Sequence, residues 1–161
     1  MTFQRKFILD VFDNLHGTSR AYLSVARKNG KSALIAAILL AHLVGPEARQ
    51  NSQIISGARS RDQASLVFKL AEKMVRLSPD LSKIVRIVPS QKMLVGLICN
   101  VEFKAISAES GTAHRLSPVL AILDEVGQVR CPHDAFIEAI DTALRNKAAK
   151  LDNIEKALRK K

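Results

Sequence analysis

One short stretch of this sequence decides the fold: Ser24-Val25-Ala26-Arg27-Lys28-Asn29-Gly30-Lys31-Ser32. It begins within an apolar run, residues 21–25, that predicts a buried strand. It ends at the start of residues 32–44, which are apolar almost all round and predict a buried helix. A strand, a loop closing on Gly30-Lys31-Ser32 and a helix are together typical of a phosphate-binding loop. We therefore expect an α/β domain that binds a phosphorylated ligand here.

The residue types of this loop suit a nucleoside triphosphate. Backbone N–H groups at a helix start offer donors and a positive dipole end to phosphate, and Gly30 lets that backbone come close. Lys31 is expected to bridge the β- and γ-phosphates and Ser32 to offer its hydroxyl to Mg²⁺. Lys28 and Asn29 complete the loop that we expect to contact the nucleotide. A Gly-Lys-Ser tripeptide also occurs by chance, so its context carries the prediction.

A second signal follows about 90 residues later in the chain. Residues 119–123 form a continuous apolar run that predicts a buried strand, and Asp124 and Glu125 follow it directly. Phosphoryl transfer needs one carboxylate to orient Mg²⁺ and another to polarise the attacking water. The alternative is that this acidic pair only caps a loop. The two signals in this order favour the catalytic interpretation.

Arg27 lies inside the loop and has two interpretations. An arginine there could reach the γ-phosphate and offset charge in the transition state. Alternatively it is a basic loop residue that binds phosphate without specificity or pairs with a neighbouring carboxylate.

The remaining pattern predicts strands alternating with helices, which favours a mainly parallel sheet flanked by helices. Asn100 is the expected turn between the last two short β-type runs. The expected helices cover residues 3–15, 62–77 and 134–161, and the expected strands cover residues 53–57, 84–88, 93–98 and 101–106.

Composition bounds the class of protein. The chain has 161 residues, a formal net charge of +10, a pI near 10.0 and 47% hydrophobic residues. These values fit one folded domain and exclude a disordered chain, and the charge suggests a polyanionic partner. Two cysteines, Cys99 and Cys131, are too few for a disulfide scaffold, and Cys131 with His133 has no second ligand pair for zinc. No run is long enough to span a membrane.

The loop also resembles a known family. Residues 24–32 look like the Walker A segment of the large terminase subunit of tailed bacteriophages, the HK97-like group, in which the first Gly of the general consensus is commonly absent and an Arg takes the position of Arg27. Here Val25 replaces that Gly. Further similar stretches are residues 3–7, 56–64, 107–118 and 120–125, the last resembling Walker B.

This resemblance implies roles for individual residues in a P-loop NTPase that uses ATP and Mg²⁺. Lys31 and Ser32 would bind phosphate and metal, Asp124 would orient the metal, and Glu125 would be the catalytic carboxylate. Arg27 would be the arginine that acts in cis, and Gln4 would read the adenine edge.

The resemblance also implies a setting: an ATPase that drives double-stranded DNA into a procapsid in the bacterial host cytoplasm. Its implied partners are DNA, the small terminase subunit and the portal, with a homo-oligomer possible and no membrane involved. Residues 1–145 would form the ATPase domain, incomplete at its C-terminal end and without the nuclease domain. Weak or absent hydrolysis is expected of the isolated chain, because we expect it to lack the coupling strand and such motors usually need a neighbouring subunit or the portal.

Residues 146–161 are expected to form a basic helix outside the resemblance. Residues 144–161 contain seven Lys or Arg and two Asp or Glu, which supports an alternative function. In that alternative the chain is an inactive prophage remnant that acts only as a basic DNA-binding or interaction module. A helicase fragment is disfavoured by Arg27 and by the loop at residues 107–118.

Overall fold

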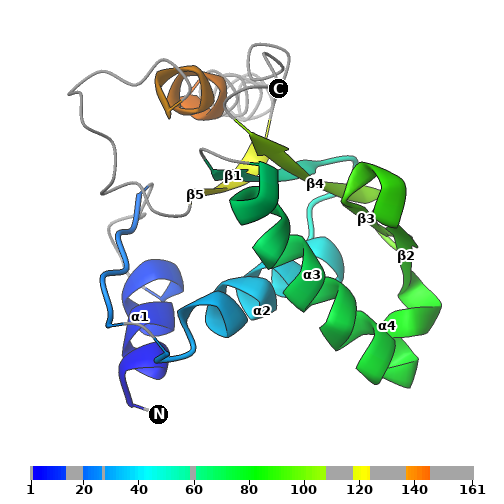
Figure 1. Cartoon of the computed structure of the whole chain (residues 1–161), viewed down its shortest axis with the longest axis horizontal. Helices are drawn as coiled ribbons and strands as arrows, with labels where there is room; N and C mark the ends of the chain where they lie inside the picture. The colour runs from blue at the N-terminus through cyan, green and yellow to red at the C-terminus, as the bar shows by residue number, and fades with distance from the viewer. Residues whose placement is uncertain are drawn as a thin grey trace, which may run out of the picture.

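The structure is a computed structural model that describes residues 2–13, 20–26, 28–58, 61–107, 118–123 and 137–145. Its helices are α1 (Thr2–Phe12), α2 (Lys31–Val44), α3 (Arg61–Leu77), the short α4 (Pro79–Ile84) and the 3-10 turn η1 (Pro89–Gln91). Its strands are β1 (Gln53–Ala58), β2 (Val85–Val88), β3 (Met93–Gly96), β4 (Val101–Ser107) and β5 (Pro118–Leu123). A further helix covers residues 137–145. The predicted α/β fold is confirmed (Figure 1).

The five strands form one sheet in the order β2-β3-β4-β1-β5. β1 lies between β4 and β5 and is parallel to both. β3 is antiparallel to β4 and to β2, so β3 alone runs against the other strands. The sheet is therefore mainly parallel, as the sequence predicted, and the carboxyl ends of β1, β4 and β5 lie at the same edge.

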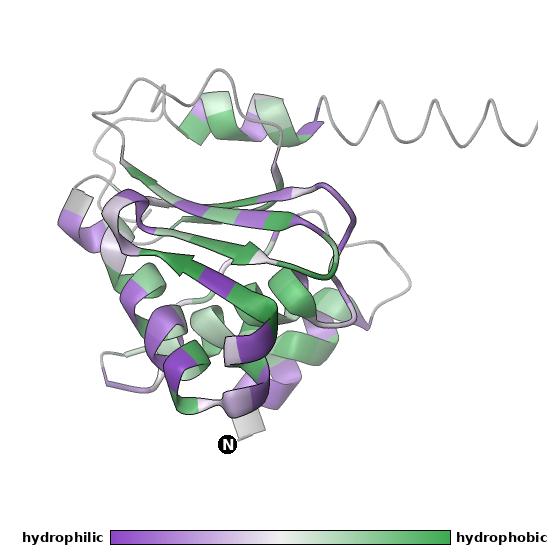
Figure 2. Ribbon diagram, turned by 90° about the vertical axis from the view of Figure 1, so that its right-hand side faces the viewer, coloured by the Kyte–Doolittle hydropathy of each residue, from purple (hydrophilic) through white to green (hydrophobic). Residues whose placement is uncertain are grey.

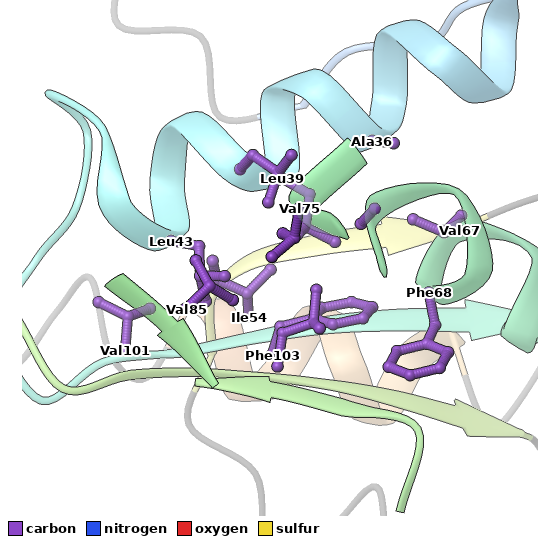
Figure 3. Close-up of a cluster of buried hydrophobic side chains, with 13 residues drawn as sticks. Ala36, Leu39, Leu43, Ile54, Val67, Phe68, Val75, Val85, Val101 and Phe103 are labelled. Carbon is purple, nitrogen blue, oxygen red and sulfur yellow. The ribbon is translucent and has the colours of Figure 1, made fainter. Parts of the chain in front are cut away.

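The main core lies between this sheet and two helices, α2 and α3 (Figure 3). Residues of α2 are apolar on all sides, so the helix can bury Leu39 and Leu43 completely against β-strand side chains such as Ile54 and Phe103. α3 instead has one apolar face, which contributes Ala64, Val67, Phe68, Ala71 and Val75. Burial of such side chains contributes about 1.5–3 kcal/mol each and makes this cluster the main source of stability.

The opposite face of the sheet carries the helix at residues 137–145. Its Ile140 is fully buried against Ile55 of β1 and Ile106 of β4, and Leu144 packs at the margin of the same cluster. Ala121 and Leu123 of β5 also contact this group. Figure 2 shows the sheet with this helix on one side and the other helices on the opposite side. The result is the three-layer arrangement expected of an α/β domain.

α1 packs beside α2, with Phe12 and His42 in ring contact at 5.4 Å between centroids. Four apolar residues of α1, Phe3, Ile8, Leu9 and Phe12, are 37–42% exposed. None of the described helices has the length and apolar character needed to cross a membrane.

One predicted strand is wrong. Residues 20–26 are neither helix nor strand and join no strand in the described part of the chain, and Tyr22 is 81% exposed. The sheet ends at β5 in the described residues, so this apolar run lacks the strand ladder that burial in a sheet requires.

Two elements were missed, and one prediction is only partly covered by the structure. Neither α4 nor η1 was expected, although Ser78 caps α4 through Leu81 N (3.4 Å) and Pro79 begins it, a recognisable start signal. Of the helix expected over residues 134–161, residues 137–145 are helical and the rest lies outside the described residues.

Candidate nucleotide-binding site

The start of α2 carries no side-chain cap. Gly30 is the N-cap residue in the left-handed region (φ 75°, ψ 17°), and it places no side-chain acceptor on the first N–H groups of the helix. Gly30 O accepts the first helical bond, from Leu34 N at 3.0 Å. The first turn contains no acidic residue, and Lys31 and Ser32 are half-buried at its start. The positive end of the helix dipole thus meets no carboxylate from its own first turn.

The loop before α2 turns sharply at two positions. Lys28 has φ 67° and Gly30 has φ 75°, with Asn29 between them in an ordinary conformation. A non-glycine residue in the left-handed region costs about 1–2 kcal/mol. Such strain is typical of functional loops. Lys28, Asn29 and Gly30 are all exposed residues, so the loop lies at the surface of the domain.

Gln4 reaches this loop from α1. A Cβ built on Gly30 would lie 3.2 Å from Gln4 Nε2, so the amide sits directly beside the N-cap of α2. Gln4 is half-buried, in contrast to its exposed neighbours Phe3 and Arg5. The structure therefore brings Gln4 together with the Gly-Lys-Ser segment, although they are separated by about 26 residues in sequence. Its predicted role in reading adenine stays a prediction.

The second predicted motif approaches the same edge of the sheet. The C-terminal end of α2 lies at the opposite edge of the sheet. A Cβ added to Gly96, at the end of β3, would lie 2.3 Å from Leu43 O in the last turn of α2. α2 therefore begins toward the edge where β1 and β5 end. β5 ends at Leu123, directly before Asp124 and Glu125. Ligands of open α/β sheets bind outside the carboxyl ends of the strands.

Three predicted site residues, Arg27, Asp124 and Glu125, lie outside the described residues, so their roles stay predictions. Within the described ranges, no group of three or more His, Cys, Asp or Glu side chains gathers to hold a metal ion. Hydroxyl and phosphate oxygens together with a carboxylate are the ligands that Mg²⁺ accepts. Ser32 at the start of α2 offers a hydroxyl oxygen of this kind, and Asp124, next to β5 in the sequence, would offer a carboxylate.

One contact of the segment before the loop could not be foreseen from the sequence. Arg20 Nη2 binds both carboxylate oxygens of Asp141, at 2.5 and 2.6 Å, across 121 residues of chain. Arg145 Nε contacts Asp141 Oδ2 at 2.9 Å from the next turn of the same helix. Only the spacing of Asp141 and Arg145 was visible in the sequence, as a pair four residues apart on a helix.

The chain also matches a known protein family. The model of the family "Terminase large subunit, ATPase domain" matches residues 12–155. The chain belongs to this family. The resemblance drawn from residues 24–32 and 120–125 is therefore confirmed.

Two matches, one to a sequence and one to a crystal structure of the same phage protein, show how similar the chain is to a known large terminase. The large terminase subunit of Enterobacteria phage HK97 is 67% identical over 141 residues, which is 88% of this chain and 28% of the relative. The crystal structure of the HK97 bacteriophage large terminase superposes with a TM-score of 0.85 and 66% identity, over 89% of this chain and 30% of the other. The chain thus spans less than a third of these terminase relatives.

Proposed function

We propose that this terminase domain binds ATP with Mg²⁺ at the loop of residues 28–32 and the start of α2. The observation that supports it most is the open helix start. Gly30 offers no competing side-chain cap, no acidic residue lies in the first turn, and Lys31 and Ser32 are the first two helical residues. Phosphate oxygens can accept hydrogen bonds from the backbone N–H groups of this first helical turn. The positive charge of Lys31 can offset the negative charge of the phosphates.

Each remaining residue then has a task. Ser32 and Asp124 would hold the metal, which supplies charge neutralisation of the phosphates. Gln4 supports recognition of the base, because its amide lies beside Gly30 and can exchange hydrogen bonds with an adenine edge. Glu125 would accept a proton from the attacking water, and Arg27 would contact the γ-phosphate. The strained backbone at Lys28 fits a loop whose shape is fixed before the nucleotide arrives.

The whole terminase would use this hydrolysis to move double-stranded DNA into a procapsid. Its partners would be DNA, the small terminase subunit and the portal, with copies of the large subunit acting together in the host cytoplasm. Belonging to the terminase ATPase family supports this setting.

Titration with a fluorescent ATP analogue tests the proposal. The wild-type chain is expected to bind in the presence of Mg²⁺, and Lys31→Ala to weaken binding at least about tenfold, the loss expected when a charge-assisted phosphate contact is removed. Lys73→Ala on the exposed face of α3 is the matched control and is expected to bind as the wild type does. Equal affinities of the wild type and Lys31→Ala would contradict the proposed site.

A DNA titration separates the competing interpretation of the chain as a basic interaction module. If DNA affinity fell steeply with salt and disappeared on deletion of residues 146–161, while no ATP bound, the basic-module alternative would replace the ATPase proposal.

A further inference from the structure

The segment that leads into the phosphate loop is held to the domain in an unusual way. Residues 20–26 pair with no strand of the sheet in the described part of the chain. Tyr22 is 81% exposed, and Leu23 and Val25 are only half-buried, so none of the apolar side chains of this segment is fully buried. Within the described residues, the ion pair between Arg20 and Asp141 is the polar contact that joins this segment to the rest of the domain.

The other end of this tie is firmly seated. Asp141 follows Ile140, which is 1% exposed and packs against Ile55 and Ile106 on the sheet. A helix anchored by a fully buried isoleucine cannot shift without opening a cavity in that cluster. The carboxylate of Asp141 therefore presents a fixed partner to Arg20.

The same helix also contacts the strand that precedes the predicted acidic pair. Leu123, the last residue of β5, packs at the margin of the Ile140 cluster, and Asp124 follows it directly. One short helix is thus linked to both sides of the proposed nucleotide site. Its apolar face supports β5, and Asp141 on its surface holds the chain that enters the loop.

We propose that Asp141 is a positioning residue of the nucleotide site: by holding Arg20 it fixes residues 20–26 and, through them, the loop that closes on Gly30. This inference rests on the proposed ATP-binding function. It does not require the ion pair to stabilise the fold, since side chains that are 50% and 31% exposed contribute little to stability. The pair acts instead on where the loop lies, and a displacement of about 1 Å in a positioning element is enough to weaken a site strongly.

Asp141→Asn is the central variant, because it removes the charge and keeps the size of the side chain. We expect affinity for the ATP analogue to fall about fivefold and backbone amides of residues 21–30 to exchange faster with deuterium, while the thermal midpoint stays near that of the wild type. The loss of affinity is expected to shrink as salt rises, because salt also weakens the wild-type pair.

Two controls separate this effect from the loss of any surface ion pair. Arg145→Gln removes the other partner of the same carboxylate but leaves Arg20 in place. Glu72→Gln removes a comparable pair, 2.7 Å from Arg76 on α3, away from the loop. Both variants are expected to keep wild-type affinity and wild-type exchange at residues 21–30.

Reversal of the pair provides a rescue. Arg20→Asp combined with Asp141→Arg is made together with Arg145→Gln, because two arginines one helical turn apart would otherwise repel each other. We expect this variant to recover most of the affinity lost in Asp141→Asn.

The outcomes distinguish the two proposals. If the wild type bound ATP and Asp141→Asn bound it equally well with unchanged exchange, the positioning role would be wrong and the nucleotide site would stand. If Arg145→Gln weakened binding as much as Asp141→Asn, the effect would belong to the helix rather than to the tie with Arg20, and the inference would also fail. If the wild type bound no nucleotide, both proposals would be wrong.

Discussion

The side-chain amide of Gln4 lies against the bare Cα of Gly30, so that a Cβ on Gly30 would come within 3.2 Å of Gln4 Nε2. The same glycine has φ 75°, a conformation that costs an L-residue about 1–2 kcal/mol. We therefore predict that Gly30→Ala lowers the free energy of unfolding by about that amount and weakens ATP binding, because the loop must move or Gln4 must turn away. Urea unfolding and nucleotide titration measure the two effects.

A double variant separates strain from contact. Adding Gln4→Ala to Gly30→Ala removes the crowding and leaves the backbone strain, so stability is expected to recover in part and ATP affinity not to recover. If Gly30→Ala alone were as stable as the wild type, the left-handed conformation of residue 30 would be contradicted.

Lys28 provides the opposite test, since it already carries backbone strain with φ 67°. We predict that Lys28→Gly leaves the free energy of unfolding unchanged or raises it by up to about 1 kcal/mol, because glycine adopts this conformation freely and its extra entropy in the unfolded chain offsets part of the gain. Asn29→Gly is the matched control: its φ is ordinary, so the same substitution is expected to cost about 0.5–1 kcal/mol. Chemical denaturation of both variants measures these changes in the free energy of unfolding. A Lys28→Gly variant less stable than the wild type would mean that the strain at Lys28 is absent.

Most of the fold could be predicted because each element has its own local signal. The apolar face of α3 and the continuous apolar run of β5 were visible as periodicities in the sequence. The run at residues 21–25 has the same local pattern as a strand. A strand also needs a neighbouring strand with which to pair, and a local sequence pattern does not show whether such a neighbour is present. The sheet order and the direction of β3 likewise depend on contacts between distant residues.

The site divides in the same way. Gly30, Lys31 and Ser32 are adjacent in sequence, and the spacing alone placed them at a helix start. Gln4 was assigned from family resemblance, and the structure brings it beside Gly30. The tie between Arg20 and Asp141 could not be predicted, because two charged residues 121 positions apart carry no shared pattern in one sequence.

Gly96 marks a close approach between β3 and the end of α2. A Cβ there would lie 2.3 Å from Leu43 O, a backbone atom that cannot rotate away. We predict that Gly96→Ala lowers the free energy of unfolding by about 1–3 kcal/mol, the usual cost of overpacking a core. Leu97→Ala at the next, 53% exposed position is the control and is expected to stay within about 0.5 kcal/mol of the wild type. Thermal and urea unfolding compare them, and equal stability of Gly96→Ala and Leu97→Ala would contradict the close packing.

Ile140 seats the helix at residues 137–145 on the sheet, opposite the main core. It is 1% exposed and contacts Ile55 and Ile106, so Ile140→Ala is predicted to cost about 2–5 kcal/mol through lost burial and the cavity left behind. The control is Leu66→Ala, which removes a 49% exposed leucine from α3 and is expected to cost far less.

Substitutions on the two faces of the sheet are expected to have additive effects on the free energy of unfolding. Leu39 belongs to the cluster under α2 and α3, and that cluster shares no buried residue with the Ile140 cluster. Leu39→Ala is again expected to cost about 2–5 kcal/mol, and this cost should add to that of the substitution at Ile140 within about 0.5 kcal/mol. Where the double variant with Ile140→Ala does not fold, the milder Ile140→Val takes its place. Urea unfolding of the single and double variants measures the coupling. A coupling well above that limit would show that the sheet transmits strain between its faces, so that the helix carrying Asp141 and the core beneath α2 respond to each other as one unit.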